Sequence, residues 1–114
     1  FFTINQWFDE SFFNENAMQN LHFPSINYKN LNKFKNKYMK VYNEKPIKVS
    51  ILGYDALGLI YYCWANNNFQ FKKDQLYNKK GFKALHGKFI ILNNQSRQKL
   101  NIYKISEKKF IKVY

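Results

Sequence analysis

The side chains that could support catalysis or metal binding are few, and they lie far apart in the sequence. The chain holds two histidines, His22 and His86, and one cysteine, Cys63. None of them belongs to a pattern such as HExxH, closely paired cysteines or a GxSxG turn, and there is no glycine-rich phosphate loop. We therefore expect a protein that is not an enzyme and that holds neither a metal ion nor a cofactor.

The acidic residues are more informative. Asp9 and Glu10 are adjacent in a loop, but a general acid and base must converge on one substrate position, so we interpret them as solvated loop residues. Asp55 is the only charged residue of an apolar segment, where a carboxylate needs a hydrogen-bond partner or a place at the surface. Asp55 is expected either to anchor the start of a helix or, with Tyr54, to border a ligand cleft.

Cys63 lies in the apolar stretch 60–65 and has no second cysteine with which to form a disulfide. Reactive thiolates need exposure and a cationic neighbour, so we interpret Cys63 as a buried, unreactive thiol. A single free cysteine leaves the redox compartment open.

The composition indicates one small folded domain with a basic surface. At 114 residues, 46% hydrophobic and 20% aromatic, the chain is too apolar for a disordered tail. Its formal charge of +12 suggests nucleic-acid binding, but Arg97 is the only arginine, and recognition of phosphate and guanine favours arginine over lysine. We interpret the charge chiefly as a codon bias that places lysines on solvated faces, and nucleic-acid binding stays a third alternative.

Two segments show helical periodicity. Over residues 28–43 the apolar side chains form one stripe with lysines opposite, and Pro46 requires the helix to end near Asn43. Residues 49–66 are apolar around most of the helical wheel, which predicts a helix that is covered on several sides and is the most buried element. Its two glycines, Gly53 and Gly58, indicate close approach of a neighbouring backbone.

The remaining segments predict short elements. We expect a buried strand over residues 1–5, one helical turn within 12–18, a loop over 21–25 and a short helix over 74–80, which Gly81 closes in the left-handed conformation. Three further strands should form an antiparallel meander, with polar turns at 93–96 and 106–108; they cover 87–92, 99–105 and 109–114. The longest apolar run, 56–65, is too short to cross a bilayer.

Five stretches carry a family resemblance: 6–9, 33–46, 53–56, 81–89 and 97–100. Their order resembles the C-terminal part of type I periplasmic binding proteins, the superfamily of the leucine/isoleucine/valine-binding receptors. Within it, the chain is most similar to the penicillin-binding protein activators, the LppC-like lipoproteins of proteobacteria. Ala84 stands where that family favours glycine, and the turn at 93–96 lacks the usual glycine. The resemblance covers nearly the whole chain.

The resemblance implies an α/β fold, namely the C-terminal portion of a two-lobed body whose N-terminal half is missing. Residues 1–114 would then form one partial domain. In the receptors, the loop after the first strand lines the cleft between the lobes, and here it reads Asn5, Gln6 and Trp7. A carboxylate in this loop can pair with the ammonium group of an amino-acid ligand, and the neutral Asn5 and Gln6 do not suit that role.

Two functions follow from the resemblance. The first is a non-catalytic periplasmic regulator of peptidoglycan synthesis, which contacts a peptidoglycan synthase and reaches the membrane only through a lipid anchor outside this chain. The alternative is a solute-binding receptor of an ABC-type transporter, which binds an amino acid or a similar small polar ligand.

A partial domain should leave apolar surface uncovered. We expect Leu57, Ile60, Tyr61 and Trp64 to be exposed, because one amphipathic helix and a small meander cannot cover every face of the apolar helix. Lys29, Lys33 and Lys40 should be exposed on one face of the first helix without carboxylate partners. If they instead surrounded a groove with exposed aromatic residues, nucleic-acid binding would be favoured.

Overall fold

The computed structural model describes residues 8–114, which form two compact units. One unit combines residues 8–28 with residues 100–114, and the other consists of residues 29–99. Each unit contains its own three-stranded antiparallel sheet. The strand predicted over residues 1–5 lies outside the described residues.

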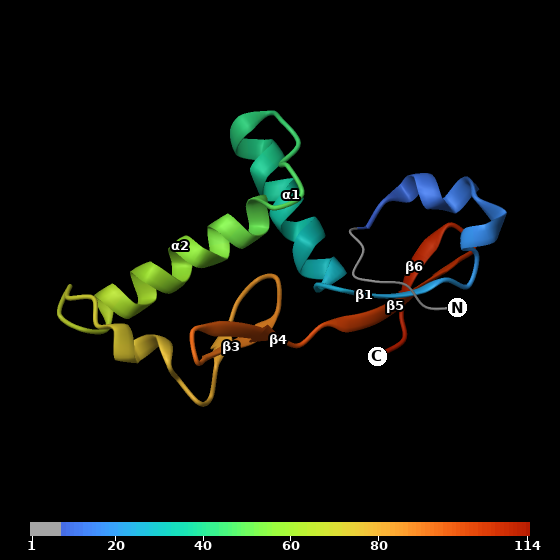
Figure 1. The fold of residues 1–114 in the computed structure, drawn as a ribbon. Coiled ribbons are helices and arrows are strands. Elements are labelled where there is room, and N and C mark those ends of the chain that lie inside the picture. Colours follow the sequence, from blue (N-terminus) through green and yellow to red (C-terminus); the bar gives the residue numbers. More distant parts are fainter. Residues whose placement is uncertain (1–7) are drawn as a thin grey trace. The chain divides into compact units, whose positions relative to one another are not determined.

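The sheet of the first unit has the strand order β1-β5-β6 (Figure 1). Two 3-10 helices precede it, in the region where the sequence predicts a single helical turn. The strands are β1 (His22–Ser25), β5 (Asn101–Ser106) and β6 (Lys109–Lys112), and the 3-10 helices are η1 (Glu10–Asn14) and η2 (Asn16–Met18).

Strand β1 corrects the prediction of a loop over residues 21–25. Its register pairs Phe23 with Tyr103 and Pro24 with Ile102 of β5. Because β1 is an edge strand among the described residues, the missing N–H of Pro24 removes no bond from the interior of this sheet. The local sequence indicated a loop, but pairing with a distant segment makes residues 22–25 a strand.

The core of the first unit is a cluster of aromatic rings. Phe8 packs edge-on against Phe23, Tyr103 and Phe110, with ring centroids 5.7, 4.8 and 5.1 Å apart, and lies 4.4 Å from the ring of Tyr28. The Tyr103 hydroxyl accepts a hydrogen bond from the backbone N–H of Tyr28 at 2.9 Å. Such ring pairs add stability beyond the burial of their area, so this small sheet has a closed core of its own.

The second unit contains two helices and a second sheet. Helix α1 (Tyr28–Tyr42) begins at the boundary between the units, and α2 (Ser50–Ala65) follows a short loop. Both predicted helices are thus confirmed. Figure 1 shows the N-terminal end of α2 beside α1, from which the two helices diverge, and the ring of Tyr54 lies 5.7 Å from that of Phe34 at this junction.

The second sheet has the order β2-β3-β4, so the three predicted C-terminal strands do not form one meander. The polar stretch 93–96, predicted as a turn, is partly strand, because Asn93 and Asn94 both have positive φ and make a two-residue hairpin turn. The elements are β2 (Phe82–Lys83), β3 (Lys88–Leu92), β4 (Gln95–Gln98) and, in place of a helix over 74–80, the 3-10 helix η3 (Lys73–Leu76).

Gly81 adopts the predicted left-handed conformation, with φ +72°, although it follows a turn and not a helix. A Cβ atom at this position would lie 2.6 Å from both the Phe89 carbonyl oxygen and Cγ2 of Ile90. By contrast, a Cβ atom at Gly53 or Gly58 would meet nothing within 4 Å. The close approach of a neighbouring backbone that was predicted at these two glycines is therefore not found within the described residues.

Helix α2 is not the most buried element, contrary to the prediction. Ile51, Asp55 and Cys63 are its only buried residues. The four residues expected to be exposed, Leu57, Ile60, Tyr61 and Trp64, are all exposed. The second sheet is too small to cover more than one side of this helix, so only the stripe that faces the hairpin is buried.

Candidate functional site

Two of the five residues predicted to border a ligand cleft lie within the described part of the chain. Tyr54 and Asp55 are in the second turn of α2. Asn5, Gln6 and Trp7 lie outside the described residues. The structure therefore describes the surroundings of Tyr54 and Asp55 alone among these five residues.

Asp55 joins α2 to the loop before β3. Its Oδ1 accepts a hydrogen bond from the backbone N–H of Leu85 at 3.0 Å, and its Oδ2 accepts one from the backbone N–H of His86 at 2.8 Å. Oδ2 also contacts Nδ1 of the His86 ring. Asp55 and His86 are both buried. Hydrogen bonds to a charged group contribute about 1.5–3 kcal/mol each, so this carboxylate is a strong local anchor.

Further hydrogen bonds hold the same loop from other sides. The Asn30 side chain in α1 donates to the Leu85 carbonyl at 3.0 Å, and the Gln98 side chain in β4 donates to the His86 carbonyl at 3.2 Å. The His86 ring stacks on Phe89 at 5.4 Å. The loop is thus fixed to α1, α2 and the hairpin together, and the geometry supports the anchoring interpretation of Asp55.

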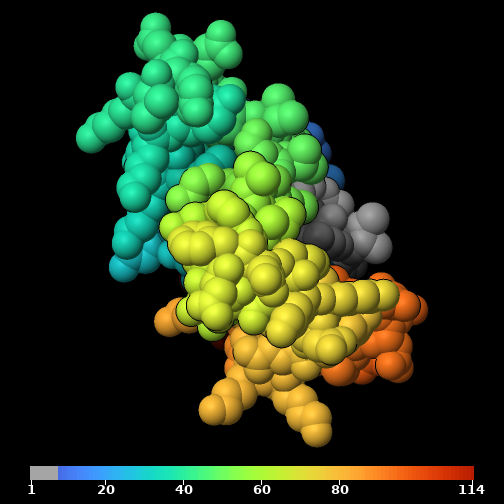
Figure 2. Space-filling model, turned by 90° about the vertical axis from the view of Figure 1, so that its left-hand side faces the viewer, coloured from blue at the N-terminus to red at the C-terminus, as the bar shows by residue number. Residues whose placement is uncertain are grey.

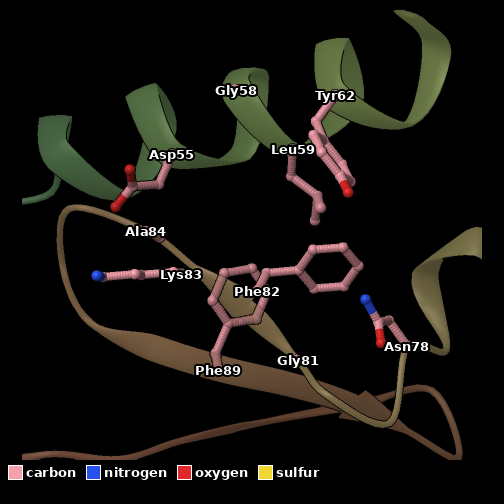
Figure 3. Close-up of a pocket in the computed structure, with 10 residues that line it drawn as sticks. All are labelled: Asp55, Gly58, Leu59, Tyr62, Asn78, Gly81, Phe82, Lys83, Ala84 and Phe89. Carbon is pink, nitrogen blue, oxygen red and sulfur yellow. The ribbon is translucent and has the colours of Figure 1, made fainter. Parts of the chain in front are cut away.

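A pocket of about 440 Å³ lies between α2 and the hairpin (Figure 3). Its walls are largely apolar, with Leu59 and Tyr62 on the helix facing Phe82 on β2. Figure 3 shows Asp55 near one end and Asn78 at the other. The Asp55 oxygens already accept hydrogen bonds from the loop, and no nucleophile is paired with a base along the wall. The pocket can hold apolar groups.

Tyr54 faces a different space. It lines a groove between α1 and α2, where the rings of Phe34, Tyr38 and Tyr42 continue from it in a row. The Tyr54 side chain is 59% exposed. Tyr54 and Asp55 therefore line different spaces within the described residues, and a ligand-binding role for either residue stays a prediction.

The lysines of α1 bear on the nucleic-acid alternative. Lys29, Lys33 and Lys40 are exposed, as predicted, and no ion pair links them to a carboxylate within residues 8–114. Of these three, only Lys33 lines the groove beside the exposed rings; Lys37 is the other lysine there. The rings of Tyr38 and Tyr42 pack on one another, with centroids 4.6 Å apart, and Lys29 and Lys40 lie outside this groove. The groove gives the nucleic-acid alternative little support.

Other chemical possibilities are limited. Over residues 8–114, no group of three or more His, Cys, Asp and Glu side chains is arranged to hold a metal ion. Cys63 is buried, and burial raises the pKa of its thiol, which disfavours the reactive thiolate. No helix within the same range has the length and apolar character required to cross a membrane.

Sequence reasoning missed the partners of Asp55. His86 was considered only as a metal ligand, although a lone carboxylate in an apolar helix signals a missing partner. The backbone N–H groups of Leu85 and His86 carry no signal in the sequence, because every residue except proline has such a group.

No family model matches the chain, and no curated protein matches its sequence. Two solved structures resemble its fold. A protein assigned to a branched-chain amino acid ABC transporter of Rhodospirillum rubrum aligns over 98% of this chain with a TM-score of 0.82 and 14% identity, and a leucine-binding protein of Thermotoga maritima aligns over 88% with a TM-score of 0.56 and 15% identity. The chain spans about a third of each, 36% and 31% respectively.

These likenesses show the fold. The chain is a mixed α/β structure that matches a fragment of the type I periplasmic-binding-protein fold, as the sequence predicted. One of the two similar structures is described as a branched-chain amino acid ABC transporter and the other as a leucine-binding protein, and neither description names a penicillin-binding protein activator.

Proposed function

We propose that this chain is part of a non-enzymatic, periplasmic solute receptor that binds a small polar molecule, such as an amino acid, for an ABC-type transporter. The observation that carries this proposal is the alignment of 98% of the chain with a transporter-associated protein at a TM-score of 0.82. A receptor of this kind works by closing two lobes around its ligand, so the protein needs no catalytic group.

The groups proposed to contact the ligand are Asn5, Gln6 and Trp7. The side-chain amides of Asn5 and Gln6 can donate to a ligand carboxylate, whereas a neutral amide is a weaker partner than a carboxylate for a ligand ammonium group. The Trp7 indole supplies a flat apolar surface and one N–H donor. We assign Asp55 to the scaffold and not to the ligand, because two backbone N–H donors and the His86 ring already contact its carboxylate.

A thermal-shift screen of the protein at its natural length against the amino acids tests this function. A ligand at a hundredfold excess over its Kd stabilises the folded state by about 2.7 kcal/mol, which is readily measured as a rise in Tm. The Trp7→Ala variant should lose this rise while its Tm without ligand stays the same. Tyr42→Ala, which removes an exposed ring elsewhere, should keep it.

The second candidate is a regulator of peptidoglycan synthesis that contacts a peptidoglycan synthase. It is favoured by the order of motifs over residues 81–89 and 97–100 and by the lack of a carboxylate at 5–7. If no amino acid raises Tm and the purified protein instead retains a peptidoglycan synthase, the receptor proposal is wrong and the regulator replaces it.

A further inference from the structure

Helix α2 has two opposite faces with different surroundings. One face, which includes Ile51, Asp55 and Tyr62, meets the loop and hairpin of the second unit. The opposite face, which we term the outer face, consists of Gly53, Leu57, Ile60, Tyr61 and Trp64. These residues recur at the spacing that places side chains on one side of a helix.

The outer face is apolar and open. Leu57, at its centre, is 71% exposed, and no residue of the face carries a charge. A helix whose free side meets water normally carries polar residues there. The apolar surface continues beyond the helix, because Phe69 packs edge-on against Trp64 at 5.1 Å and Phe71 is exposed as well. In Figure 2 the C-terminal end of α2 and the following segment, in yellow, face the viewer with nothing in front of them.

The composition of α2 argues against a lipid surface as the cover. Helices that lie on membranes carry lysine or arginine along their polar side, whereas the only charged residue of α2 is Asp55, which is buried against the hairpin. With 16 residues, α2 is also short for a bilayer span of about 20. An uncharged, broad apolar face suits another layer of protein.

Gly53 supplies an independent indication. A glycine inside a helix costs about 1 kcal/mol relative to alanine, and nothing among the described residues comes within 4 Å of a Cβ placed there. A covering layer that approaches the helix closely would require a residue without a side chain at this position. Gly53 lies on the outer face itself.

We propose that the outer face is an internal interface, covered by a part of the same polypeptide that lies outside these 114 residues. The two similar structures support a covering segment from the same polypeptide. This chain matches only 36% and 31% of their lengths, so most of each of those folds is built from other segments. The covering layer is apolar and uncharged where it meets Leu57. The inference holds for either candidate function.

Two substitutions of equally exposed residues test it in the protein at its natural length. Leu57 is 71% exposed here and Ile47 is 72% exposed, but only Leu57 belongs to the outer face. Leu57→Glu should lower Tm by roughly 5 °C or more, because it buries a charge, and Ile47→Glu should leave Tm almost unchanged. If both variants keep the parent Tm, the outer face is solvent-exposed and the proposal is wrong.

A labelling experiment covers the case in which Leu57→Glu fails to fold. Leu57→Cys should react with a thiol reagent at least about tenfold more slowly than Ile47→Cys in the native protein, and at the same rate in urea. Equal native rates would overturn the proposal. Sedimentation distinguishes the internal interface from a cover formed by a second copy of the chain. If the protein is a dimer that Leu57→Glu converts to monomers, a second copy covers the outer face and the internal interface is excluded.

Discussion

The two units of the chain solve the problem of burying apolar residues in different ways. Residues 8–28 and 100–114 close a sheet over a cluster of aromatic rings and expose few large apolar side chains. Residues 29–99 form a unit about twice as long, but they hold far more than twice as many exposed large apolar side chains: fourteen of the seventeen within residues 8–114. One unit has a closed core of its own, and the other presents a surface suited to a further layer.

The charges divide in the same way. Residues 29–99 contain fifteen lysine and arginine residues against three acidic residues, whereas the other unit contains four of each. The whole formal charge of +12 therefore belongs to the unit with the open apolar faces. Net charge of one sign keeps a surface soluble, so the lysines of α1 can offset part of the tendency of these faces to associate.

The largest expected effect concerns the aromatic core of the first unit. Phe23→Ala removes a buried ring that contacts Phe8, Tyr103 and Phe110, and it should destabilise this unit by about 3–5 kcal/mol. Hydrogen exchange should show lost protection at Ile105 while the amides of α2 stay protected. Equal loss in both regions would mean that the units unfold together and would break the comparison.

The second prediction removes the anchor of the other unit. Asp55→Ala leaves two backbone N–H groups and the His86 ring without their acceptor and should cost about 3 kcal/mol. Denaturant unfolding measures this loss. Asp74→Ala, at an exposed position of η3, is the control and should change stability by less than about 0.5 kcal/mol. Similar losses for both variants would contradict an anchoring role of Asp55.

A pair of glycine substitutions should act in opposite directions within residues 29–99. Gly81→Ala places a Cβ against the Phe89 carbonyl at positive φ and should destabilise by more than about 1 kcal/mol. Gly58→Ala has open space around it and should stabilise α2 by about 0.5–1 kcal/mol. Thermal unfolding distinguishes the two. A destabilising Gly58→Ala would show that another segment packs on that position.

The smallest effect concerns charge. Lys33 has lysines four residues away on both sides, at positions 29 and 37, and like charges at this spacing repel by a few tenths of a kcal/mol. Lys33→Gln should therefore raise the free energy of unfolding by about 0.3 kcal/mol at low salt. This gain should vanish at a salt concentration of about 1 M, where screening is strong. Lys109→Gln, in the unit whose charges balance, should give no such gain. Equal gains for the two variants would contradict an electrostatic difference between the two units.

The sequence by itself determined the elements that depend on neighbouring residues. The 3.6-residue period of 28–43 and the apolar content of 49–66 predicted both helices, because helical hydrogen bonds join residues four apart. The exposure of Leu57, Ile60, Tyr61 and Trp64 also followed from counting too few segments to cover them. The left-handed conformation of Gly81 was predicted for a glycine that closes a helix, and it is observed although a turn and not a helix precedes it.

Only the tertiary structure decided which strands pair and what Asp55 binds. Strand β1 exists because Phe23 pairs with Tyr103, and the two lie at opposite ends of the chain. The partners of Asp55 are backbone groups thirty residues away, and backbone groups are chemically alike along the sequence. Long-range pairing depends on which chain segments meet after folding, so local patterns that fix a helix cannot fix a sheet or a buried hydrogen bond.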